Sequence, residues 1–159
     1  MKRWAAFEAE APQLADDGRR LLHGQPDGLA RAYLATTRSD GGPRVHPVMP
    51  VLSHGGLYVF VVEMSLKRQD LVRDGRFALH AYEPPGAGEE FYVAGKAQPV
   101  ADPALHLAVS ASTGGVLGTH EFELLFEFFP THILHTRWTA WGTAQTWPTY
   151  KKWRAQAAS

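Results

Sequence analysis

Apolar and polar residues alternate with a period of two over much of residues 32–62, which predicts strands rather than helices. The first run is Ala32–Thr37, a turn follows at Asp40-Gly41-Gly42, and the chain returns as Arg44–Leu52. Because glycine readily adopts the positive φ of tight turns, we expect a β-hairpin here. The next run, Leu57–Val62, is wholly apolar and predicts a strand that is covered on both sides.

Further alternating segments extend the mainly β prediction. Arg76–Tyr82, Glu89–Val100 and Glu121–Phe128 are each expected to form a strand, and Ile133–Trp138 a last one. Gly95 marks a place where a ligand or another backbone comes close. Acidic and apolar residues alternate in Glu121–Phe128. The apolar side chains of this strand are expected to close a barrel: Phe122, Leu124, Phe126 and Phe128.

Helices are predicted at the N-terminus, in residues 4–23, which read as one or two helices. Pro12 suits a helix start, and Gly18 is expected to weaken the middle. The leucines that can share one face are Leu14, Leu21 and Leu22. We interpret this segment as a cap over one end of a barrel, with a lid over the substrate as the alternative.

Two shorter helices are predicted from their capping residues. Ser65 is a suitable N-cap for a helix over Leu66–Arg73, and Gly75 is a suitable stop. Asp102 followed by Pro103 opens a second helix, expected to run to about Ser110.

Composition narrows the class of protein. The 159 residues suit a single domain over residues 1–159, and sixteen basic residues balance sixteen acidic ones, which argues against a general nucleic-acid or membrane surface. No cysteine is present, so thiolate metal sites and cysteine nucleophiles are excluded. His132 and His135 lie three apart, which on a strand turns them to opposite faces, so we expect no metal site. No apolar run is long enough to span a bilayer, and a cytoplasmic location is the prediction.

A short basic segment, Ser65-Leu66-Lys67-Arg68, stands where a buried strand ends and a helix begins. The free amides of a helix start can receive an anion, and the Ser65 hydroxyl and Lys67 add a donor and a charge. Arg44 carries a planar fork of donors that matches phosphate oxygens. The alternatives are a solvated Arg44, a Ser65 that only caps, and basic residues on a wet helix face paired with Asp70 and Asp74.

The order of these segments resembles the pyridoxamine 5′-phosphate oxidase-like, FMN-binding split β-barrel family. The resemblance covers about residues 30–100. It rests on Leu-Ala-Thr, Asp-Gly, Pro-Arg-Val, a Gly-Leu-Tyr-Val strand, Ser-x-Lys, Asp-Gly-Arg-Phe-Ala-Leu and Phe-Tyr-Val-x-Gly-Lys-Ala in that order. It implies a β-barrel with flanking helices, of the split, FMN-binding type. Leu66 departs from the pattern, since authentic oxidases commonly place a second basic residue there.

The resemblance also implies site residues. Arg44, Ser65 and Lys67 would contact the cofactor phosphate, while Val45, His46 and Pro47 would line the isoalloxazine. Val62 and His80 are further candidate cofactor contacts, although a satisfied structural histidine is the alternative for His80. Family members are usually homodimers with the cofactor between subunits, so Trp138 or Trp141 is expected to reach the partner's flavin.

The function implied is an FMN-dependent oxidoreductase acting on an unidentified small molecule, and no general acid or base can be named. The alternatives are a deazaflavin (F420)-dependent reductase of the same fold and a non-catalytic flavin- or haem-binding protein, with His46, His80 or His135 as candidate iron ligands. The tail, residues 138–159, mixes aromatic and basic residues. Such a mixture also suits single-stranded nucleic acid, but the balanced charge favours an interface.

Overall fold

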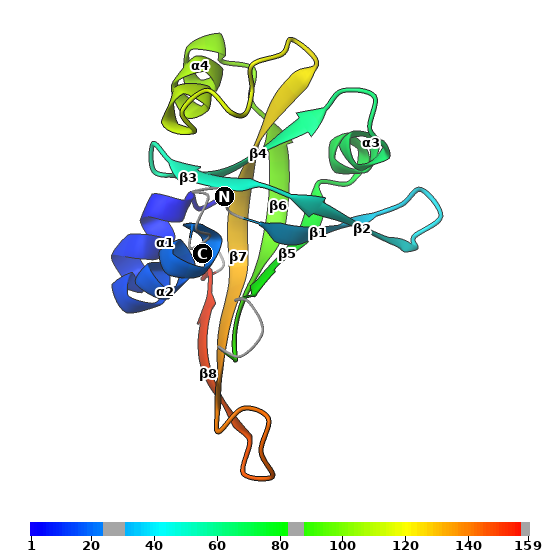
Figure 1. The fold of residues 1–159 in the computed structure, drawn as a ribbon. Coiled ribbons are helices and arrows are strands. Elements are labelled where there is room, and N and C mark those ends of the chain that lie inside the picture. The colour runs from blue at the N-terminus through cyan, green and yellow to red at the C-terminus, as the bar shows by residue number, and fades with distance from the viewer. Residues whose placement is uncertain (24–30, 83–87, 157–159) are drawn as a thin grey trace.

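The structure is a computed structural model, and it describes residues 1–23, 31–82 and 88–156. Within these ranges, one antiparallel sheet of eight strands curls around the core, with four helices packed about it (Figure 1). The strand order is β2-β1-β5-β6-β7-β4-β3, and β8 pairs with β7. The mainly β prediction is therefore confirmed.

The elements follow the chain in this order: α1 (Trp4–Glu10), α2 (Pro12–His23), β1 (Ala32–Thr37), β2 (Pro43–Val48), β3 (Pro50–Ser53), β4 (Gly56–Val62), α3 (Leu66–Arg73), β5 (Arg76–Tyr82), β6 (Glu89–Pro99), α4 (Pro103–Ser112), β7 (Glu123–Thr139) and β8 (Trp147–Arg154). No helix within these described ranges is long and apolar enough to cross a membrane.

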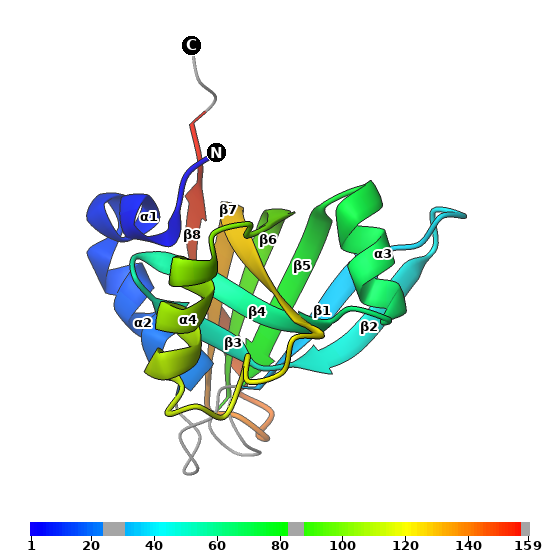
Figure 2. The same cartoon turned by 90° about the horizontal axis from the view of Figure 1, so that it is seen from above.

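The predicted return strand Arg44–Leu52 is wrong as a single element. It divides at Met49 into β2, which pairs with β1, and β3, which pairs with β4. Proline has no N–H to donate, so Pro47 and Pro50 weaken a continuous ladder on either side of this residue. The two strands lie at opposite edges of the sheet order, and the curl of the sheet brings these edges together (Figure 2).

β7 joins two segments, Glu121–Phe128 and Ile133–Trp138, that the sequence predicts as separate strands. It runs for 17 residues and pairs with β4 in its first part, with β6 along most of its length and with β8 in its last part. The ladder with β6 shifts register between Ala94 and Gly95, next to Pro130. A Cβ on Gly95 would lie 2.0 Å from the carbonyl oxygen of Phe129, so the predicted close approach of another backbone is confirmed.

Phe122 does not close the barrel as predicted. It precedes β7 and is exposed, whereas Phe126 and Phe128 are fully buried. Ile133–Trp138 was expected to supply the last strand, but a further strand, β8, forms in the aromatic tail at Trp147–Arg154. Within the tail, residues 157–159 lie outside the described residues.

The N-terminal helices pack their apolar side on the sheet. Phe7 and Leu22 are buried in the main core, next to sheet residues such as Phe91. Gly18 does more than weaken α2: a Cβ there would lie 2.5 Å from the Phe91 ring, so glycine permits the helix to approach β6. This packing favours the cap over the lid.

Candidate functional site

The predicted cap of α3 is confirmed, and it fixes the start of this helix beside the end of β4. The Ser65 side chain accepts a hydrogen bond from the Arg68 amide, and the Ser65 amide donates to the Val62 carbonyl at 3.0 Å. Val62 and Ser65 are therefore neighbours. Glu63 between them is exposed.

Arg44 lies on β2 opposite Thr36 of β1, on the side of the sheet that faces the core and α3. Its Nε donates to Oδ2 of Asp70 at 2.7 Å. Asp70 is a residue of α3 and only 3% exposed. Asp70 also accepts from the Thr36 hydroxyl at 2.9 Å and from Nη2 of Arg73 at 3.1 Å. Arg44 is thus neither solvated nor free, but held against α3 through one edge of its guanidinium.

Basic groups on β2 and on the first turn of α3 keep unused hydrogen-bonding capacity. His46 shares the inner side of β2 with Arg44, and its Nε2 is buried without a hydrogen-bond partner among the described residues. On α3, Nε of Arg68 is also buried and has no hydrogen-bond partner in the described part of the chain. Lys67 is half-buried and makes no ion pair with a carboxylate of the described residues. Of the three basic residues of α3, Lys67, Arg68 and Arg73, only Arg73 forms an ion pair with Asp70 within the described ranges.

Electrostatics connect these groups. Burial, together with the charges of Lys67 and Arg44, lowers the pKa of His46, so the imidazole sits among cations. Burial also lowers the pKa of Lys67. An anion bound here would favour the charged form of both side chains. The arrangement is suited to a phosphate or a similar anion at the start of α3.

Val45, Pro47 and His80 lie on the opposite, outer face of the sheet. On β1, Leu34 faces the core and pairs with His46 and Leu79, while Tyr33 faces outward and pairs with Pro47 and His80. The strand alternation therefore separates these three residues from Arg44 and His46 by the thickness of the sheet. The nearest carboxylate to His80 is that of Glu90, 3.8 Å from Nε2.

The turn between β7 and β8 lies at the far end of the molecule from α3 (Figure 1), and it contains Trp141. Trp141 is 52% exposed and makes an edge contact with Trp138, with ring centroids 5.5 Å apart. Within one chain it does not reach the residues around Arg44.

His135 and His132 face opposite sides of β7, as their spacing predicts, since His135 is buried and pairs with Phe91 while His132 pairs with Ala94. Nδ1 of His135 lies 3.3 Å from Asp17 Oδ2 and its Nε2 lies 3.2 Å from Glu89 Oε2. Both ring nitrogens of this candidate iron ligand are therefore already engaged by carboxylates.

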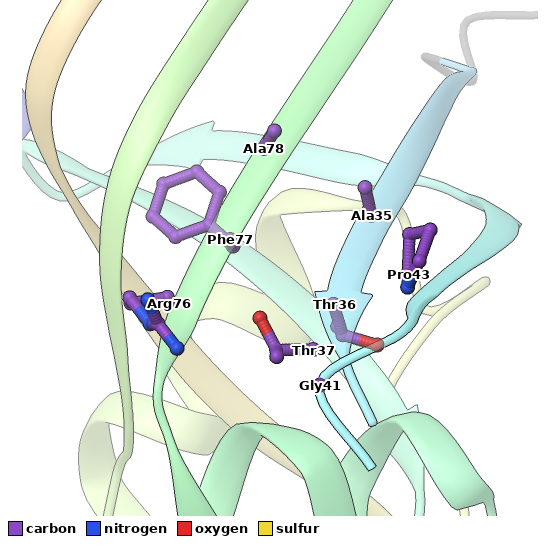
Figure 3. A pocket seen from close by; sticks show the side chains of 8 residues that line it. All are labelled: Ala35, Thr36, Thr37, Gly41, Pro43, Arg76, Phe77 and Ala78. Atoms are coloured by element: carbon purple, nitrogen blue, oxygen red, sulfur yellow. The ribbon is translucent and has the colours of Figure 1, made fainter. Parts of the chain in front are cut away.

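A pocket of about 270 Å³ opens beside the β1–β2 hairpin and β5 (Figure 3). Ala35, Ala78 and Pro43 share their strand faces with His80 and Val45, so the pocket belongs to the outer face. None of the predicted site residues lines it. Its lining is Ala35, Thr36, Thr37, Gly41, Pro43, Arg76, Phe77 and Ala78.

Comparison with solved structures identifies the architecture, whereas no protein-family model and no curated protein matches the chain. A Clostridium acetobutylicum protein related to general stress protein 26, of the pyridoxinephosphate oxidase family, superposes with a TM-score of 0.60 at 11% identity, covering 94% of this chain and 95% of that one. This is the split β-barrel fold of the pyridoxamine 5′-phosphate oxidase-like proteins.

Two further solved structures that are similar to this chain are named for other ligands. An F420 reductase superposes with a TM-score of 0.56 at 22% identity, covering 72% of this chain and 94% of that one. A haem-binding protein from Mycobacterium smegmatis gives 0.57 at 18% identity and covers 75% of this chain. This chain spans only 52% of that protein. At these identities the comparisons establish the fold alone.

Two residues of this split barrel were not among the predicted contacts. Asp70 entered only the alternative of a wet helix face, as a partner of basic residues, but it is the buried partner of Arg44, 26 positions away. Arg68 belongs to the basic segment Ser65–Arg68, and the alternative of a solvated Arg68 does not hold for its Nε, which is buried. No local sequence signal marks Asp70 as buried, because Thr36 and Arg44, which bind it, lie on other elements.

Proposed function

We propose that the chain binds FMN with the phosphate at the start of α3 and acts as a flavin-dependent oxidoreductase on a small molecule. The observation that carries the proposal is the set of basic groups there with unused hydrogen-bonding capacity. Nε of Arg68 and Nε2 of His46 are buried without partners, and Lys67 has no carboxylate partner among the described residues. Buried polar atoms normally have partners, so atoms left without one favour a ligand.

Each residue has a distinct part in this site. Arg44 and Lys67 would supply charge to the phosphate, Arg44 through a fork of donors and Lys67 as a point charge. The Ser65 cap orients the first free amides of α3 toward the same anion. Arg68 and His46 would donate from their unpaired nitrogens. Bound FMN supplies hydride and electron transfer, and the protein sets its orientation and its access to substrate.

The rest of the proposed site requires a second subunit. Val45 and Tyr33 are exposed on the outer face, and apolar surface of this kind favours an interface. We place Val45, Pro47 and His80 at this interface of a homodimer. Trp141 would then reach the flavin of the partner, since the turn between β7 and β8 lies far from α3 of its own chain (Figure 1).

The same residues suit a deazaflavin phosphate, because the groups around Arg44 recognise the phosphate and not the ring. An F420 reductase is among the similar structures, which supports this as the second candidate. Haem receives less support, since His135 is engaged on both nitrogens and His46 lies among cations.

The test begins with an absorption spectrum of the purified protein and mass spectrometry of any molecule released by heat. FMN titration of the Arg44→Ala/Lys67→Ala variant should then show affinity lowered by about a hundredfold or more, because two charge-assisted contacts are lost. The control is Arg38→Ala/Lys152→Ala, which removes the same charge from exposed positions. Equal FMN affinity in both variants contradicts the phosphate site. Binding of FMN without oxidation of any reduced nicotinamide favours a binding protein over an enzyme.

A further inference from the structure

We propose that Asp70 is a positioning residue, which fixes Arg44 so that the terminal nitrogens of its guanidinium face the phosphate of the bound ligand. The inference rests on the proposed function, because it assigns the group that prepares that phosphate site. Asp70 itself does not touch the ligand in this scheme, and it acts through Arg44.

Three elements converge on the Asp70 carboxylate. Oδ2 accepts from Arg44 Nε of β2 at 2.7 Å and from the Thr36 hydroxyl of β1 at 2.9 Å. Oδ1 accepts from Arg73 Nη2 of α3 itself at 3.1 Å. The side chain is buried, and a buried carboxylate is tolerated only when it is paired and hydrogen-bonded. Burial opposes the charge, but these three donors hold the pKa of Asp70 below its ordinary value.

The contact with Arg44 selects one edge of the guanidinium. Nε is used by Asp70, and the terminal nitrogens form no hydrogen bond with any described residue. An arginine side chain has several rotatable bonds, and ordering it on binding lowers affinity. Asp70 has already ordered Arg44 in the free protein, so the remaining donors are presented in a fixed direction.

The net charge of the site and the positioning of Arg44 predict opposite effects of an Asp70 substitution on FMN affinity. Asp70 brings a negative charge close to a proposed anion site, so Asp70→Asn makes the site more positive. If only net charge mattered, the variant would bind FMN more tightly. If Asp70 positions Arg44, the variant binds FMN more weakly, because the amide cannot offer the same two charged acceptors. The sign of the change therefore separates the two explanations.

The experiment compares FMN with riboflavin, which lacks the phosphate, in titrations of the wild type and of Asp70→Asn. We expect FMN affinity to fall by about tenfold or more, the effect of losing a hydrogen bond to a charged group, while riboflavin affinity stays the same. In the Arg44→Ala background, Asp70→Asn should cause no further loss, since the two residues act as a unit. Arg44→Lys, which keeps the charge but not the fork, should reproduce the loss if Asp70→Asn does not fold.

The matched control is Arg73→Ala. Arg73 also bonds Asp70 and donates to the Thr37 carbonyl, so its loss should lower the melting temperature without changing the preference for FMN over riboflavin. Unchanged or tighter FMN binding in Asp70→Asn, an equal loss for both flavins, or additive losses with Arg44→Ala would overturn the role of Asp70 alone. A wild type with no preference for FMN would overturn the phosphate site as well.

Discussion

Gly95 is the position where one added methyl group should damage the sheet most. In Gly95→Ala the Cβ would lie 2.0 Å from the Phe129 carbonyl oxygen, whereas ordinary contacts begin near 3.4 Å. The obstacle is backbone, so no side chain can turn away, and β6 and β7 must move apart. Loss of two or three ladder hydrogen bonds at about 1 kcal/mol each lowers the free energy of unfolding by about 3 kcal/mol.

Thermal unfolding followed by circular dichroism measures this effect. For a chain of this length, about 3 kcal/mol corresponds to a fall in Tm of roughly 6–12 °C. Gly114→Ala is the control, because nothing lies within 4 Å of its Cβ and only the positive φ of 67° opposes alanine. That backbone cost of about 1 kcal/mol should lower Tm by roughly 2–4 °C. A Tm of Gly95→Ala equal to or above that of Gly114→Ala would refute the argument.

Three further outcomes are expected. Ser65→Ala removes the α3 cap and should lower the free energy of unfolding by about 1 kcal/mol in urea titrations, with an unchanged value counting against the cap. Phe91→Ala empties a fully buried ring site and should cost about 3–5 kcal/mol in the same assay, and a loss below about 1 kcal/mol would contradict its core position. Hydrogen bonds from Arg44, Thr36 and Arg73 lower the pKa of Asp70 from its ordinary value of 3.8. The ionised carboxylate therefore stabilises the fold above the ordinary pKa, and this stabilisation is lost as the pH falls through the lowered pKa. The stability difference between the wild type and Asp70→Asn should therefore shrink below about pH 4, and a difference independent of pH would contradict the ionised carboxylate.

Local patterns predicted the elements well where one residue decides the outcome. Ser65 and Asp102 cap their helices because each offers an oxygen to an amide two or three residues on. The apolar run Leu57–Val62 forms the buried strand β4 because it has almost no polar side to expose. The split barrel was implied by the resemblance to a known family, and the structural comparison supports it.

Contacts between distant residues were not predictable in the same way. The pairing of Arg44 with Asp70 depends on how α3 lies across β1 and β2, and no sequence period encodes that geometry. The division at Met49 depends on β2 and β3 finding different partners. The separation of His80 from His46 becomes visible only when strand register assigns each to a face.

The prolines around Met49 also bear on the behaviour of the protein in concentrated solution. β2 and β3 are the two ends of the strand order, and unpaired strand edges are where other chains add and aggregation starts. β2 contains Pro43 and Pro47, and β3 begins with Pro50, so each end strand lacks amide donors that an incoming strand would need. The same residues that divide the strand therefore protect both ends of the sheet against fibre growth.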